Sequence, residues 1–66
     1  MKDLGSKIKQ LRICLALSQT ELAAKLGIKQ QVLSRWENDQ VKPSMKSIKK
    51  LADALEVHPK ELTKRY

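Results

Sequence analysis

The sequence predicts a compact all-α domain of five helices, and two observations lead to that prediction. Apolar residues recur every three or four positions along most of the 66 residues, which places them on one face of a helix. Between these stripes stand residues that start or stop helices, namely Ser18 with Glu21, Gly27, and Ser44 after Pro43. We therefore expect a single domain spanning residues 1–66, without repeats, linkers or low-complexity segments.

The composition favours a polyanionic partner. Fourteen Lys and Arg against seven Asp and Glu give a net charge of +7. That charge suits nucleic acid or an anionic membrane surface, and an ordinary solvated basic surface is the alternative. The only aromatic residues are Trp36 and Tyr66, which argues against single-strand binding by base stacking. A chain of this length is near the lower limit for a self-sufficient core, so we expect no separate sensing or catalytic domain.

The compartment is also predicted. The N-terminal segment MKDLGSKIKQL lacks the apolar run of a signal peptide, and no stretch approaches the length of a membrane span. Cys14 is the only cysteine, so an intrachain disulfide is impossible. We expect a cytoplasmic protein in which Cys14 is a small, mostly buried filler.

Three helices are expected outside the central motif. The first is capped by Asp3 or Ser6 and runs to about Ala16, with an apolar stripe of Leu4, Ile8, Leu11 and Leu15. The fourth begins after its cap at Ser44, and its predicted buried stripe is Met45, Ile48, Leu51, Ala52 and Leu55. His58-Pro59 opens a fifth helix, anchored by Leu62.

Residues 19–38, QTELAAKLGIKQQVLSRWEN, read as two short helices joined by a turn. The apolar stripe of the first helix is Leu22, Ala23 and Leu26. Gly27 ends that helix, because glycine enters the left-handed region without strain, and Ile28 fills the bend. In the second helix, residues 30–38, Leu33 and Trp36 are three positions apart and are expected to point inward.

The opposite face of that second helix is entirely polar. It consists of Gln30, Gln31, Ser34, Arg35 and Asn38, with no aliphatic residue and no carboxylate. Amide, hydroxyl and guanidinium groups match the donors and acceptors of base edges in the major groove of DNA. We expect base contacts from Gln30, Gln31, Ser34 and Arg35. Each glutamine can pair with adenine N6 and N7, and the arginine with guanine O6 and N7.

This stretch resembles the helix-turn-helix of the phage-repressor and Cro (XRE-type) family. The matching features are Gln19, Ala23, Gly27, Leu33, Trp36, the run Ser34-Arg35-Trp36-Glu37-Asn38, the triplet Lys42-Pro43-Ser44, and LADALEV at residues 51–57. The resemblance covers roughly Leu4 to Leu62. It implies a lambda-repressor-like fold and a transcriptional regulator that binds double-stranded DNA sequence-specifically, with the helix of residues 30–38 in the major groove.

The resemblance also implies roles for residues around that helix. Expected backbone contacts are Gln19, Lys29, Asn38, Lys42, Lys46 and Arg12. Arg12 and Glu37 are further expected to face each other as a structural brace between helices. Relatives bind as symmetric dimers on half-sites about one helical turn apart. We expect a homodimer on an inverted-repeat operator, joined through the segment around Leu55 to Pro59 and the C-terminal helix.

The chain departs from the family at three positions. Lys29 stands where the family usually has a capping Ser or Thr, and Asp39 and Glu56 stand where it commonly has glycine. A lysine cannot accept a hydrogen bond from the helix start, which costs about 1 kcal/mol or less. A nearby phosphate would offset that cost. Asp39 puts an anion near the expected path of the phosphates.

Nothing in the sequence favours catalysis. His58 is the only histidine, no His, Cys and carboxylate cluster has metal-ligand spacing, and there is no glycine-rich phosphate loop. We expect no enzyme, metal, cofactor or small-molecule ligand.

Two other functions compete with DNA binding. One is an antitoxin-like protein-interaction module with the same fold. The other is a basic membrane binder, which the inward stripes and the glycine turn disfavour. Within the DNA-binding class, a phage repressor, a chromosomal or plasmid regulator and a restriction–modification controller all remain open.

Overall fold

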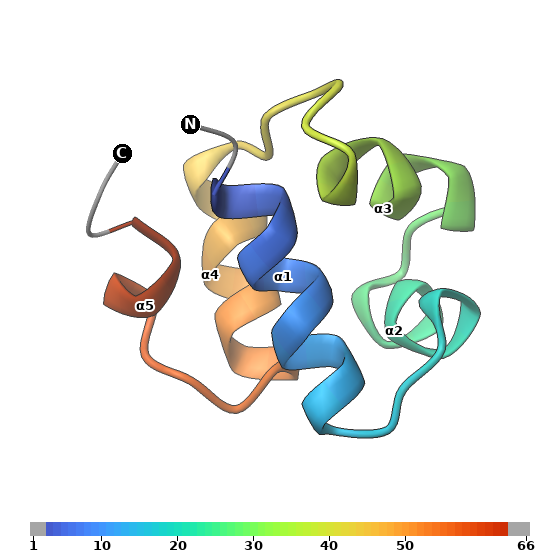
Figure 1. Ribbon diagram of the computed structural model, residues 1–66, viewed down its shortest axis with the longest axis horizontal. Helices are drawn as coiled ribbons and strands as arrows, with labels where there is room; N and C mark the ends of the chain where they lie inside the picture. The colour runs from blue at the N-terminus through green and yellow to red at the C-terminus, as the bar shows by residue number, and fades with distance from the viewer. Residues whose placement is uncertain (1–2, 64–66) are drawn as a thin grey trace.

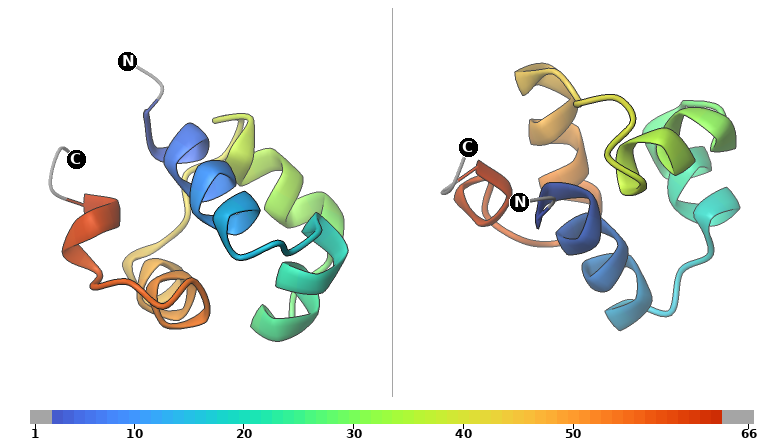
Figure 2. Two further views of the ribbon diagram at one scale, coloured as in Figure 1. Left: turned by 60° about the horizontal axis from the view of Figure 1, so that its bottom comes forward. Right: turned by 45° about the horizontal axis from the view of Figure 1, so that its top comes forward.

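Five helices make up residues 3–63, the part of the chain that the computed structural model describes (Figure 1). They are α1 (Asp3–Cys14), α2 (Gln19–Leu26), α3 (Gln30–Glu37), α4 (Met45–Ala54) and α5 (Lys60–Thr63). α1 runs through the middle of the molecule, with α2 and α3 on one side and α5 on the other (Figures 1 and 2). α4 packs against α2 and α5. The predicted all-α architecture is confirmed.

One hydrophobic core joins the five helices. Its buried apolar side chains are Leu4, Ile8, Leu22, Ala23, Leu26, Leu33, Trp36, Ile48, Leu51, Ala52, Leu55 and Leu62. The inward stripes predicted for α2 and α3 are confirmed in full. The last member, Leu62, ties the short α5 to the rest of the molecule, because its side chain is completely buried.

Two side chains predicted to be buried are exposed instead. Met45 shares a face with Ala52 but is 62% exposed. It lies seven residues earlier, about 10 Å along the helix, where the core no longer covers α4. Cys14 is also exposed. Two residues turn a helix by about 200°, so Cys14 points away from the face on which Arg12 is buried.

The first four helices end in a common backbone pattern. α1 stops at Cys14, two residues earlier than predicted, because Ala16 adopts a left-handed conformation with φ 59°. The Ala16 N–H donates to the Ile13 carbonyl (2.9 Å), and the next N–H reaches back to Arg12 (3.1 Å), which is the Schellman arrangement. The same arrangement closes the next three helices, with left-handed residues Gly27, Asp39 and Glu56.

The helix starts agree with the sequence in most places. Ser44 caps α4, its Oγ accepting from the Ser47 N–H (3.2 Å). At α5 the His58 Nδ1 accepts from the Lys60 N–H (3.1 Å). The predicted cap of the first helix is wrong, because α1 already includes Asp3, so that Ser6 lies inside the helix.

None of the helices within residues 3–63 combines the length and apolarity needed to cross a membrane.

Candidate nucleic-acid interface

The start of α2 is organised by Ser18 and Glu21. The Glu21 N–H donates to Ser18 Oγ (3.0 Å), and the Ser18 N–H donates to Glu21 Oε1 (2.8 Å), so the predicted capping box is present. The hydrogen bond from the Ser18 backbone, followed by the bond with its side chain, lowers the pKa of Glu21 from its ordinary value. The capping box fixes the beginning of α2, where Gln19 is the first helical residue.

Gly27 makes the turn between α2 and α3. Its φ of 70° and ψ of 29° are left-handed, and the following Ile28 N–H reaches back to the Ala23 carbonyl (3.0 Å). Lys29 then precedes α3 in an extended conformation, without a side-chain hydrogen bond to the helix start. The lysine side chain is exposed, as the predicted backbone contact requires.

α3 presents the predicted polar face to solvent. Leu33 and Trp36 are buried behind it. Gln30, Gln31, Arg35 and Asn38 are exposed, and Ser34 is half-buried. Within residues 3–63, neither Gln31 nor Arg35 has a side-chain hydrogen bond or ion pair. Two of the four predicted base-reading side chains are therefore free to meet another molecule.

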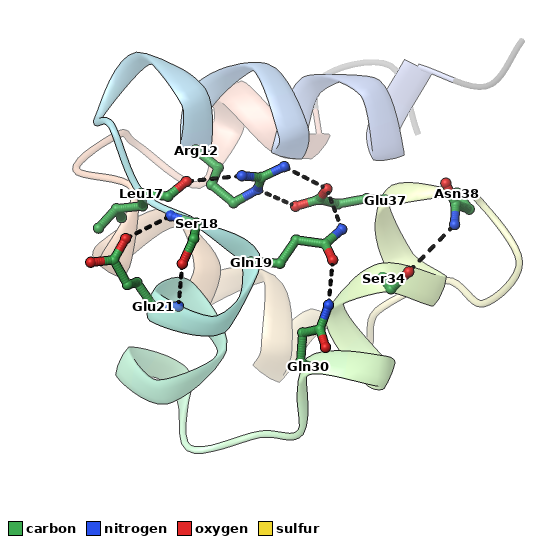
Figure 3. A network of polar contacts seen from close by, with 9 residues as sticks. All are labelled: Arg12, Leu17, Ser18, Gln19, Glu21, Gln30, Ser34, Glu37 and Asn38. Atoms are coloured by element: carbon green, nitrogen blue, oxygen red, sulfur yellow. Dashed lines mark hydrogen bonds and ion pairs between the residues drawn. The ribbon is translucent and has the colours of Figure 1, made fainter.

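A series of polar contacts connects the interior to this face (Figure 3). Arg12 pairs with Glu37 through Nε to Oε2 (2.7 Å) and Nη2 to Oε1 (3.1 Å), and the two side chains are 11% and 2% exposed. Gln19 Nε2 donates to Glu37 Oε1 (3.0 Å), and Gln30 Nε2 donates to Gln19 Oε1 (2.8 Å). The first residues of the two motif helices are thus joined to a buried ion pair.

The sequence reading missed part of that series. The resemblance placed Arg12 opposite Glu37, and the structure brings them together. Nothing predicted that Gln19 would bond both Glu37 and Gln30. The signal available was that both glutamines open helices that meet at the turn.

The remaining predicted backbone contacts lie around α3. Lys42 and Lys46 are exposed, in the loop after α3 and in the first turn of α4. Asn38 Nδ2 is 3.5 Å from Ser34 Oγ. Arg12 is the exception, because it is buried and also donates through Nη1 to the Leu17 carbonyl (2.8 Å). It has the least surface to offer a phosphate.

Asp39 is turned toward α1 rather than simply outward. Its Oδ1 accepts from the Gly5 N–H (3.1 Å), one of the amides that the start of α1 leaves without a helical partner. The approach is close, because a Cβ on Gly5 would lie 2.4 Å from the Glu37 carbonyl oxygen. This anion therefore caps a helix, a role that the sequence reading did not foresee.

A recess lies away from α3, between the C-terminal parts of α2 and α4. It has a volume of about 390 Å³ and is lined by Lys25, Leu26, Lys50, Asp53, Ala54 and Glu56, from the ends of α2 and α4. Across residues 3–63, no three His, Cys, Asp or Glu side chains are grouped so as to hold a metal ion.

Comparisons with known proteins agree with this geometry. The helix-turn-helix family model matches residues 8–62. The restriction-modification controller protein C.AhdI from Aeromonas hydrophila is 36% identical, with a TM-score of 0.86 and 89% of each chain covered. A hypothetical transcription factor, NHTF, from Neisseria is 29% identical, with a TM-score of 0.85, covering 89% of this chain and 68% of that one. A search of curated protein sequences gave no significant match. This chain belongs to the XRE-type helix-turn-helix family of DNA-binding transcriptional regulators.

Proposed function

We propose that this chain regulates transcription in the cytoplasm by sequence-specific binding of double-stranded DNA, with α3 in the major groove and α2 across the backbone. The outer face of α3 is the observation that carries the proposal. Gln31 and Arg35 are exposed there and have no side-chain partner among residues 3–63, while Leu33 and Trp36 are buried behind them. Polar side chains placed in this way can pair with base edges.

The contacts divide into two kinds. The proposed base readers are Gln30, Gln31, Ser34 and Arg35. The proposed phosphate contacts are Gln19, Lys29, Asn38, Lys42 and Lys46, with Arg12 contributing to a smaller extent. Phosphate contacts fix the register on DNA and carry the salt dependence, whereas base contacts carry the sequence preference.

Selection of bound sequences from a random duplex pool, followed by titration of variants, tests this division. Gln31→Ala and Arg35→Ala should each lose about 1–3 kcal/mol of discrimination at one base pair. Lys42→Ala should weaken cognate and scrambled duplexes alike and reduce the salt dependence. Lys50→Ala, a change of the same charge on α4, is the control. Equal losses on both duplexes for Arg35→Ala would contradict its role as a base reader.

We also propose a homodimer on an inverted-repeat operator, because one small domain offers few contacts and half-sites are read about one turn apart. Leu55 is buried, so of the predicted dimer segment only the outer residues, such as Glu56 and His58, can join α5 in a contact. Sedimentation with and without inverted-repeat DNA measures this. One protomer bound per operator would contradict it.

The likeness to C.AhdI over 89% of both chains supports a narrower proposal, that this protein is a restriction–modification controller. The operator found by selection gives the test. Its occurrence beside genes for an endonuclease and a methyltransferase in the source genome is the expected result. Occurrence only beside unrelated genes would reject this narrower role.

A further inference from the structure

We infer that Glu37 determines, through Gln19, which base edges Gln30 can read. This inference rests on the proposed function, because it requires Gln30 to meet a base. It concerns three side chains bonded in series from the interior to the surface, with the buried Glu37 at one end and the exposed Gln30 at the other (Figure 3). Glu37 is a positioning residue in this account, since it does not touch DNA.

The buried Glu37 determines which amide atom of Gln19, and then of Gln30, donates and which accepts. A carboxylate only accepts hydrogen bonds, so the Gln19 atom 3.0 Å from Glu37 Oε1 is the amide nitrogen. The Gln19 carbonyl oxygen then faces Gln30, and because it also only accepts, Gln30 approaches it with Nε2 at 2.8 Å. Arg12 holds the carboxylate in place by donating to both of its oxygens. Inverting either amide alone would place two donors or two acceptors against each other.

This direction decides what Gln30 presents to DNA. Its carbonyl oxygen and one remaining N–H face outward. Adenine N6 and cytosine N4 are donors in the major groove and complement that oxygen, whereas guanine O6 and thymine O4 are acceptors and oppose it. A glutamine free to rotate could instead offer both amide hydrogens to guanine. Glu37 thereby makes Gln30 select adenine or cytosine, the bases whose exocyclic amino group lies in the major groove.

The experiment compares four duplexes that differ only at the base pair read by Gln30, identified as the pair whose preference disappears in Gln30→Ala. The wild type should prefer adenine or cytosine, whichever it binds better, over guanine by at least about five-fold, the lower end for one good side chain–base pair. Gln19→Met keeps the side-chain length but removes both bonds, and the preference should fall toward equality. Gln10→Met, the same change at an exposed position of α1 for which no DNA contact is proposed, should leave this ratio unchanged.

Gln19 could act as a phosphate contact or as the residue that orients Gln30. Overall affinity and the ratio of affinities between duplexes distinguish these two roles. Loss of a phosphate contact weakens all four duplexes equally, so it does not move the ratio. Glu37→Gln tests the source of the direction, because its amide can donate toward Gln19 and let both glutamines invert. The ratio should fall in this variant too, measured below its melting temperature. If Glu37→Gln does not fold, Gln19→Met still decides the matter.

Three results would overturn the inference while leaving DNA binding intact. They are an unchanged ratio in Gln19→Met, an unchanged ratio in folded Glu37→Gln, and a wild-type preference for guanine or thymine at that pair. If Gln30→Ala alters no base preference, Gln30 reads no base and the inference fails. A wild-type protein that favours no duplex over a scrambled one contradicts the proposed function itself.

Discussion

The two helices of the motif have the same length of eight residues but are held in opposite ways. α2 is closed by its own sequence, with the Ser18–Glu21 capping box at one end and the left-handed Gly27 at the other. α3 begins at Gln30, after Lys29, whose side chain does not cap it, and the left-handed residue that follows the helix is Asp39 rather than glycine. By local rules α3 is the weaker helix.

Contacts with other helices hold α3. Glu37 bonds Arg12 of α1, Asp39 accepts from Gly5 of α1, and Trp36 is buried in the core. All of these contacts lie on the inner side or at the end of the helix. The outer face of α3 therefore contributes little to the stability of the helix, and its polar side chains are available to bind a ligand.

The largest effect should come from breaking the buried pair. Glu37→Leu leaves the Arg12 guanidinium buried without its partner, which should cost about 3 kcal/mol of the free energy of unfolding. Urea denaturation measures this loss. The double variant Arg12→Met/Glu37→Leu should recover most of the stability, since no uncompensated charge remains. A single variant as stable as the wild type would show that α3 is not held by this pair.

The helix ends should give the next effect. Gly27→Ala should cost about 1 kcal/mol, entirely from the left-handed backbone, because a Cβ at this position has nothing within 4 Å. Ala16→Gly makes the reverse change in the same backbone motif and should stabilise the protein by somewhat less, since glycine also gains freedom in the unfolded chain. Thermal unfolding of both variants measures the difference. If both substitutions stabilised the protein, or both destabilised it, the left-handed backbone would not be the cause of the effects.

Removing the cap of α2 should lower the free energy of unfolding by a similar or smaller amount. Ser18→Ala should cost about 1 kcal/mol, because one amide at the helix start loses its acceptor. Ser44→Ala at the start of α4 makes the same change and serves as a comparison. Stability unchanged in Ser18→Ala would show that water replaces the cap without loss.

The capping box also predicts a dependence on pH. The pKa of Glu21 is lowered in the folded state, so its contribution is complete above the unfolded value of 4.5 and is lost as pH falls through the folded value. Stability curves of the wild type and Glu21→Gln should therefore converge in acid. Parallel curves from pH 7 down to pH 3 would contradict this sign.

The smallest effect on stability should come from Lys29. Lys29→Ser supplies the missing cap of α3 and should stabilise the protein by about 0.5 kcal/mol. The same change removes a charge from the proposed phosphate contacts, so affinity for all duplexes should fall. We expect the free energy of unfolding of Lys29→Ser to rise and its affinity for DNA to fall. A rise in both would show that Lys29 does not contact the DNA backbone.

Prediction from sequence succeeded where the rule is local. The stripes of α2 and α3, the box at Ser18 and the turn at Gly27 each depend on residues within about four positions of one another. It failed where the environment decides. Met45 has the right spacing to be buried but lies beyond the end of the core, and Ala16 ends α1 without being a glycine.

The sequence by itself determined the five helices, most of the core and the polar face of α3, because helix periodicity and capping act along the chain. Tertiary structure alone decided how that face is held and oriented. The bonds Gly5–Asp39, Gln19–Glu37 and Gln19–Gln30 join residues 34, 18 and 11 positions apart. No local pattern encodes such bonds, since they form only when packing brings the helices together and each donor must find its acceptor.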